Sequence, residues 1–128
     1  MRKLGIIGGT SWSSTALYYD HINRGVAQRL GGLHSASLAI ESLDLAPVAE
    51  MELAGDWVGV TAVHLEAAKR LVKASAQAVV IASNTGHKVY DAVAAHVRVS
   101  VALEAVREEL ATTVHEAVQP SHVSVWLA

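Results

Sequence analysis

The 128-residue sequence contains no cysteine. This absence excludes disulfide bonds, thiolate metal ligands and a thiol nucleophile, and it fits a cytosolic protein. A bias of charge is missing as well, because 10 basic and 12 acidic residues give a net charge of −2 without any block of like charges. Neither a nucleic acid nor a membrane surface is therefore predicted as a partner.

Long hydrophobic runs are also missing. No apolar run approaches the roughly 20 residues that are needed to span a bilayer. The run that follows Met1-Arg2-Lys3 is too short for a signal peptide, and it leads straight into glycines. We therefore expect a soluble cytoplasmic protein. Its hydrophobic content of 52% and its length predict one globular domain with a sizeable core.

The most informative stretch runs from Val79 to Lys88. Three β-branched or aliphatic residues, Val79-Val80-Ile81, predict a buried strand, and the following Ala82-Ser83-Asn84-Thr85-Gly86 predicts a polar turn. A helical pattern comes next. In an open α/β sheet, ligands bind at the carboxyl end of such a strand. Hydroxyl, amide and backbone N–H groups here suit a carboxylate or a phosphate, although the same residues also suit a plain turn with an N-cap.

A second turn of this kind lies near the N-terminus. A short strand is predicted over residues 3–7, and it leads into Gly8-Gly9-Thr10-Ser11 and then a helix that runs to about Arg29, with Ser13 or Ser14 as its N-cap. The combination can cradle an anion at a helix N-terminus. It has neither the spacing of a dinucleotide fingerprint nor the Gly-Lys-Ser/Thr of a P-loop, so any ligand is small. The alternative is a tight turn without a ligand.

The rest of the chain predicts a parallel sheet with helical crossovers. A strand is expected over residues 36–42, a short helix starts at Ala46-Pro47, and Asp56 caps the next helix. The apolar face of that helix is expected to carry Val58, Thr61, Leu65, Ala68 and Val72. Alternating strands and helices predict an α/β fold with right-handed crossovers. Further on, we expect a strand at 97–101, an amphipathic helix over 103–117 and a final strand at 122–127.

Seven histidines are many for this length, but none forms a close ligand pair, and no metal site is predicted. His87 is the only one that the sequence places near the polar turn, four residues after Ser83. It could orient or assist a group there, or it could simply cap the helix.

Four blocks in order resemble the aspartate/glutamate racemase family, and in particular its branch of broad-specificity amino-acid racemases. They are Leu4–Thr15 with Tyr18-Tyr19, Ile22-Asn23 and Gly25; Arg29–Ala36; Gly55–Trp57; and Ser83–Val89. The resemblance covers residues 1 to about 97 and predicts one half of the two-domain racemase fold, a three-layer α/β sandwich with a short parallel sheet. Residues 98–128 are expected to be a divergent helix and strand that complete or flank this domain.

The resemblance also implies a chemistry. Enzymes of the family use neither pyridoxal phosphate nor metal, and two bases on opposite sides of the substrate exchange its Cα proton. Ser83 aligns with the first base. Thr10, Asn84 and Thr85 align with residues around the substrate carboxylate, and Glu52 aligns with a polar position near the substrate. Ser11, Gly86 and His87 are expected to support the site. The expected ligand is an amino acid or a dicarboxylate.

The sequence departs from the family in two respects. No second domain and no second base are found within the 128 residues, and a serine hydroxyl is a far weaker base than a thiol with a pKa near ~8.5. The resemblance therefore predicts a truncated racemase that is weakly active or inactive alone. A non-catalytic carboxylate-binding or assembly module, and a decarboxylase or isomerase that needs one protonating residue, are the alternatives. We also expect a homo-oligomer, because half of a two-domain fold leaves an apolar face bare and the final strand has no partner in the sequence.

Overall fold

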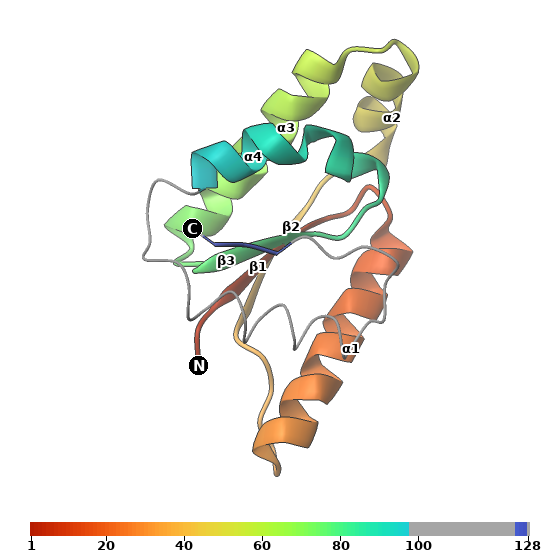
Figure 1. The fold of residues 1–128 in the computed structure, drawn as a ribbon. Helices are drawn as coiled ribbons and strands as arrows, with labels where there is room; N and C mark the ends of the chain where they lie inside the picture. The colour runs from red at the N-terminus through yellow and green to blue at the C-terminus, as the bar shows by residue number, and fades with distance from the viewer. Residues whose placement is uncertain (98–124, 128) are drawn as a thin grey trace.

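The computed structural model describes residues 1–97 and 125–127 (Figure 1). The elements follow one another as β1 (Leu4–Gly8), α1 (Trp12–Leu30), β2 (Leu38–Ser42), α2 (Leu45–Leu53), α3 (Trp57–Lys73), β3 (Ala78–Ile81), the 3₁₀ helix η1 (Thr85–Val89), α4 (Tyr90–Val97) and β4 (Val125–Leu127). The predicted alternation of strands and helices is confirmed up to α4. The strand expected at 97–101 and the helix expected over 103–117 lie outside the described residues, apart from Val97, which belongs to α4.

The sheet has the strand order β2-β1-β3-β4. β1 pairs in parallel with both β2 and β3, and Ile7 stands opposite Glu41 on one side and Ile81 on the other. β4 pairs with β3 in the antiparallel direction, with Val79 opposite Trp126. The expectation that the final strand lacks a partner within the chain is therefore wrong: residues 125–127 cover the edge of β3 that β1 leaves open.

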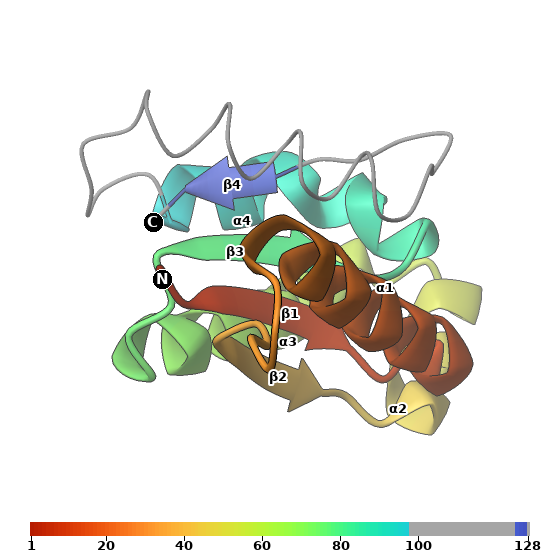
Figure 2. The same cartoon turned by 90° about the horizontal axis from the view of Figure 1, so that it is seen from below.

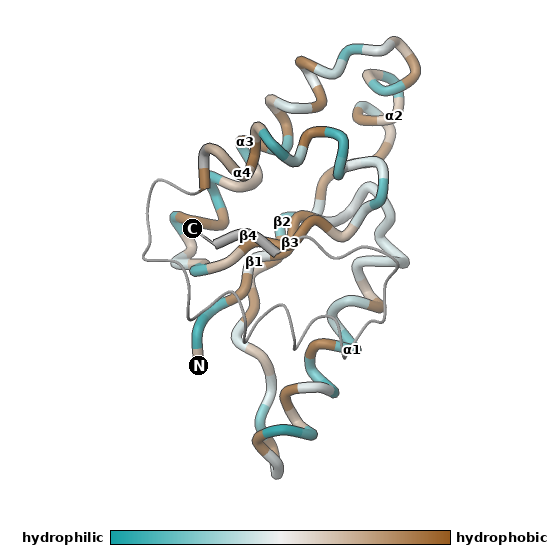
Figure 3. Tube along the Cα trace, in the orientation of Figure 1, coloured by the Kyte–Doolittle hydropathy of each residue, from teal (hydrophilic) through white to brown (hydrophobic). Residues whose placement is uncertain are grey.

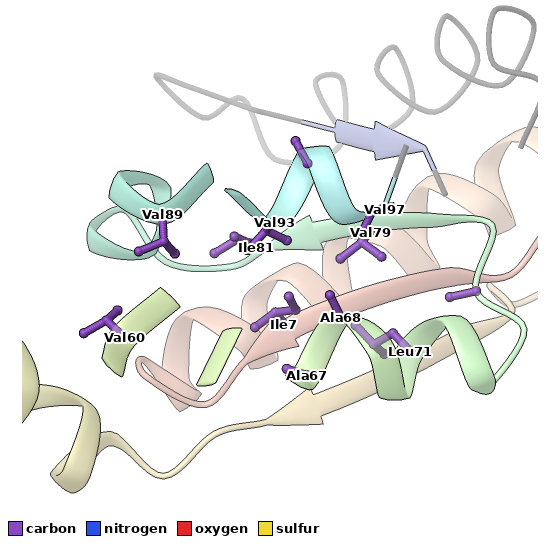
Figure 4. Close-up of a cluster of buried hydrophobic side chains, with 12 residues drawn as sticks. Ile7, Val60, Ala67, Ala68, Leu71, Val79, Ile81, Val89, Val93 and Val97 are labelled. Carbon is purple, nitrogen blue, oxygen red and sulfur yellow. The ribbon is translucent and has the colours of Figure 1, made fainter. Parts of the chain in front are cut away.

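Helices cover both faces of the sheet (Figure 2). Because side chains of a strand alternate between its two faces, β1 and β3 feed two separate cores. Ile7, Val79 and Ile81 pack with α3 and α4 on one face (Figure 4). Leu4, Ile6, Ala78, Val80 and Ala82 pack with Ile22 of α1 on the other. The predicted three-layer α/β sandwich is confirmed, and the central strands read as continuous apolar runs because both of their faces are buried (Figure 3).

The buried face of helix α3 matches the predicted one at Ala68, which is fully buried, but differs from it elsewhere. Val58 is 83% exposed, whereas the buried residues are Val60, His64, Ala67, Ala68 and Leu71. The predicted Leu65 and Val72 are only partly buried at the margin of this core. The shift arises because His64 lies on the buried face, where a polar residue is not expected from its type.

On the opposite face, α1 rests on the sheet through Ile22 and the half-buried Tyr18. Burial raises the pKa of the Tyr18 phenol, since the charged phenolate is disfavoured away from water. None of the helices described is both long and apolar enough to cross a membrane.

Candidate functional site

Two turns meet at the carboxyl edge of the sheet. Because β1 and β3 are parallel neighbours, the segments that follow them leave the sheet side by side. The N–H of Ala82 donates to the carbonyl of Ile7 at 2.8 Å, which ties the start of the second turn to the end of β1. The N–H of Leu43, just after β2, donates to the carbonyl of Gly8 at 2.9 Å. Three chain segments that are distant in sequence therefore border one region.

The first turn requires its glycines. Gly9 has φ +90, a left-handed conformation, and a Cβ there would collide with the backbone O and N of Leu43. A Cβ on Gly8 would collide with the Thr15 side chain. The backbone of the turn can therefore run close to both neighbours only because two consecutive glycines stand at this point.

Thr15 is a residue of this turn that the sequence did not single out. Its buried hydroxyl accepts a hydrogen bond from the N–H of Gly9 at 3.0 Å and donates to the carbonyl of Ser11, also at 3.0 Å. One side chain in the first turn of α1 thus links both ends of the glycine turn. Thr15 lies six residues after Gly9. This spacing indicates a hydrogen bond between them only when the start of α1 is known.

The helix α1 begins earlier than predicted. It starts at Trp12 with Ser11 in the N-cap position, so the prediction of Ser13 or Ser14 as the N-cap is wrong. The Ser11 hydroxyl makes no capping bond, and it donates to the hydroxyl of Ser14 at 2.8 Å. No acidic residue lies in the first turn of the helix, which leaves its positive end without a charge partner of its own. Thr10 lies half-buried just before it.

The second turn is organised around Ser83. The Ser83 hydroxyl is half-buried and accepts a hydrogen bond from the N–H of Gly86 at 3.3 Å. Asn84 and Thr85 are exposed, while Gly86 is buried. The turn continues as the 3₁₀ helix η1, not directly as an α-helix. The predicted residues Ser83, Asn84, Thr85 and Gly86 thus share one turn, in which the side chains of Asn84 and Thr85 are exposed.

His87 bonds to the backbone of Ser83. Its Nδ1 lies 2.7 Å from the Ser83 carbonyl oxygen, and because a carbonyl only accepts, this nitrogen carries a proton. Nδ1 therefore does not serve as a base toward the Ser83 hydroxyl in this arrangement. The bond links the ring of His87 to the backbone at the start of the turn.

Glu52 lies on α2, half-buried near the end of that helix. Among the described residues, no hydrogen bond or ion pair joins its carboxylate to either turn. Lys88 of η1 lies over the ring of Trp57 at the start of α3, with Nζ 4.5 Å from the ring centroid, a cation–π contact. Within the described part of the chain, no group of three metal-ligating side chains is found.

The arrangement is that of an open parallel α/β domain, a class in which ligands bind beyond the carboxyl ends of the strands. Residues 7–105 match the family model of the Asp/Glu/hydantoin racemases. The chain therefore belongs to the Asp/Glu/hydantoin racemase family, and the predicted resemblance is confirmed.

Two solved structures are similar to the chain. One is the crystal structure of a candidate Asp/Glu racemase from Yersinia pestis, which is 42% identical, has a TM-score of 0.74, and matches over 75% of this chain. The other is PH1733, an aspartate racemase homologue from Pyrococcus horikoshii OT3, at 32% identity, a TM-score of 0.70 and 88% of this chain. The match spans 42% of the first of these proteins and 50% of the second.

Proposed function

We propose that the domain binds an amino acid by its α-carboxylate at the carboxyl edge of the sheet and exchanges its Cα proton through Ser83. The observation that carries this proposal is the adjacency of the two turns, which follows from the parallel pairing of β1 with β3. Membership of the racemase family supports the choice of an amino acid over other small anions. An aspartate- or glutamate-like substrate is the proposed class.

In this proposal the carboxylate lies between Thr10 and Ser11 on one side and Asn84 and Thr85 on the other. Backbone N–H groups at the start of α1 and the side chains of Asn84 and Thr85 donate to it. The absence of acidic residues from the first turn of α1 supports the binding of an anion there. Glu52 would act at the edge of the site, toward the ammonium or the side chain of the substrate.

The proposed chemistry needs two faces of the substrate. Ser83 takes the Cα proton on one face and returns it to the same face, which gives exchange without inversion. Inversion needs a donor on the other face, and we propose that a second copy of the chain supplies it in a cytoplasmic homodimer. The proton transfer requires neither pyridoxal phosphate nor metal in this scheme.

A binding module without catalysis is the second candidate, and one observation favours it. The Ser83 hydroxyl already accepts a hydrogen bond from Gly86, and His87 is bonded to the Ser83 carbonyl, so neither contact makes the hydroxyl more basic. In that case the carboxylate binds between the same two turns but its Cα proton is retained.

Incubation of aspartate and glutamate in D₂O separates the two candidates. We expect slow exchange at Cα with the wild type and none with Ser83→Ala. We expect Ser83→Cys to raise exchange at least about tenfold, because a thiol titrates much closer to neutral pH than a hydroxyl. Mass spectrometry gives the deuterium content, and chiral chromatography gives the optical purity.

The order in which deuterium content and optical purity change distinguishes exchange on one face from racemisation. Deuterium with retained configuration is expected before any racemisation, since the base on one face returns the proton to that face. Equal exchange by the wild type and Ser83→Ala would contradict the assignment of Ser83 as the base. Binding without exchange in all three proteins would favour the binding module.

A further inference from the structure

A second histidine lies beside the Ser83 turn, although the sequence gives no sign of it. His64 is buried on α3, 1% exposed. Its Nδ1 lies 2.9 Å from the carbonyl oxygen of Val60, one turn earlier in the same helix. Because that oxygen only accepts, Nδ1 carries the proton, and Nε2 of the neutral ring holds a lone pair.

The Nε2 atom faces the turn. A Cβ built on Gly86 would lie 2.8 Å from Cγ2 of Ile81, 3.2 Å from His64 Nε2 and 3.5 Å from the Cβ of Ser83. The side chains of His64 and Ser83 therefore lie close to the same point beside the Gly86 backbone, next to the methyl group of Ile81. Since Gly86 has no side chain, nothing of residue 86 stands between the imidazole and the serine.

The Nε2 atom has no other partner in the part of the chain that the structure describes. The bond to Val60 through Nδ1 is the single hydrogen bond of His64 among these residues.

We propose that His64 is a positioning residue that accepts the hydroxyl proton of Ser83 through Nε2, so that Ser83 can act as a base. The inference rests on the proposed function, because it names the group that activates the same serine. In the present conformation the Ser83 hydroxyl accepts from the Gly86 N–H, which leaves its own proton available for donation. Rotation of the Ser83 side chain directs that proton toward His64.

The proton transfer balances within three groups. The Cα–H bond breaks and its proton joins the Ser83 oxygen, while the original hydroxyl proton moves to His64 Nε2. The electron pair of the broken bond stays on the substrate and spreads into its carboxylate. The imidazolium then returns a proton through Ser83, so the serine never has to ionise on its own.

The test replaces the Ser83 hydroxyl with a thiol, because the ionisation of a thiol can be followed by its rate of alkylation. Alkylation of the Ser83→Cys variant by iodoacetamide is measured between pH 5 and pH 10, with no amino acid present. An imidazolium next to a thiolate lowers the pKa of the thiol. Adding His64→Gln should therefore raise the midpoint of the alkylation profile by about 1 pH unit. His87 and Lys88, the other titratable groups on η1, are the same in both proteins.

The matched control is His21→Gln in the same Ser83→Cys background, because His21 lies on α1 and bonds to Leu17 of its own helix. This control should leave the midpoint unchanged. An equal midpoint with and without His64 would overturn the proposal. The result does not depend on turnover, so loss of Cα exchange and loss of this coupling are separate outcomes.

A second measurement leaves His64 in place, in case His64→Gln does not fold. In labelled Ser83→Cys, the ring ¹⁵N signals of His64 should move as the thiol titrates, and Nδ1 should appear as the protonated nitrogen. If the chemical shifts of the His64 ring nitrogens do not change as the thiol titrates, the proposal is overturned without any variant at position 64.

Discussion

Thr15 is the side chain on which the shape of the first turn depends most. Its hydroxyl is both acceptor and donor, toward Gly9 N–H and Ser11 carbonyl, and it is buried. A buried N–H without a partner costs about 1–3 kcal/mol. The conformation of the backbone from Gly9 to Ser11 is thus coupled to one oxygen atom on α1.

We predict that Thr15→Val lowers the free energy of unfolding by about 1–3 kcal/mol, because the substitution keeps the shape but removes both hydrogen bonds. Amide hydrogen exchange at Gly9 should accelerate in this variant. Thr15→Ser is the matched control, since it keeps the hydroxyl and should keep Gly9 protected. Equal protection of Gly9 in both variants would show that the bond is not important for the turn.

The sequence was sufficient to predict that Ser83, Asn84, Thr85 and Gly86 form a turn after β3, because a polar turn after an apolar strand is a local pattern. Thr15 and His64 could not be found in this way. The contacts of Thr15 and His64 depend on which face of the helix is buried and on which chain segment packs against that face. Both depend on tertiary packing. Histidine in particular is counted as polar by type, and so the burial of His64 was not predictable from periodicity.

The helix α3 carries His64 in its second turn, and its N-terminus is capped by a side chain. Its N-cap is Asp56, whose Oδ1 accepts a hydrogen bond from the N–H of Gly59 at 2.8 Å, as predicted from the sequence. The helix buries five residues and packs against β1, β2 and α4, and it carries Trp57 under Lys88 at its start. The position of His64 along the sheet therefore depends on how this helix begins.

We predict that Asp56→Ala lowers the free energy of unfolding by about 1 kcal/mol, in the range of 0.5–2 kcal/mol for lost N-caps. Asp56→Asn is the control, because its side-chain oxygen accepts the same bond, and it should cost only a few tenths of a kcal/mol. Urea unfolding followed by circular dichroism gives both values. Equal losses for the two variants would point to the charge of Asp56 and not to its capping bond.

Element boundaries were predictable where a local stop or start signal exists. The Asp56 cap and the Gly-Gly turn after β1 are such signals. The start of α1 was misplaced because Ser11, Ser13 and Ser14 are equally good caps by type, and only packing selects among them. The pairing of β4 with β3 joins residues nearly fifty positions apart, and no local pattern specifies such a partner.

Large apolar side chains are exposed on several elements of the described structure. Trp12 at the start of α1, Leu53 at the end of α2 and Val58 at the start of α3 are all exposed. Exposed apolar groups that gather on one side often mark an interface. The proposed homodimer would bury Trp12, Leu53 and Val58, and each copy would cover the site of the other.

We predict that the chain sediments as a dimer at tens of micromolar and that Val58→Lys shifts it to a monomer, because a charge cannot be buried there without a partner. Leu33→Lys is the matched control. Leu33 is fully exposed in the loop after α1, at the other end of that helix, and its substitution should leave the dimer intact (Figure 1). A monomeric wild type under these conditions would remove the dimer from the proposal.

The most direct test of the site is an NMR titration of the wild-type chain with aspartate or glutamate. If the two turns form one carboxylate site, the amide signals of residues 8–11 and 84–87 should shift together and saturate at the same concentration. An amine of matched size that lacks the carboxylate should leave them in place. Shifts confined to one turn, shifts elsewhere in the domain, or no shifts at millimolar ligand would contradict the site.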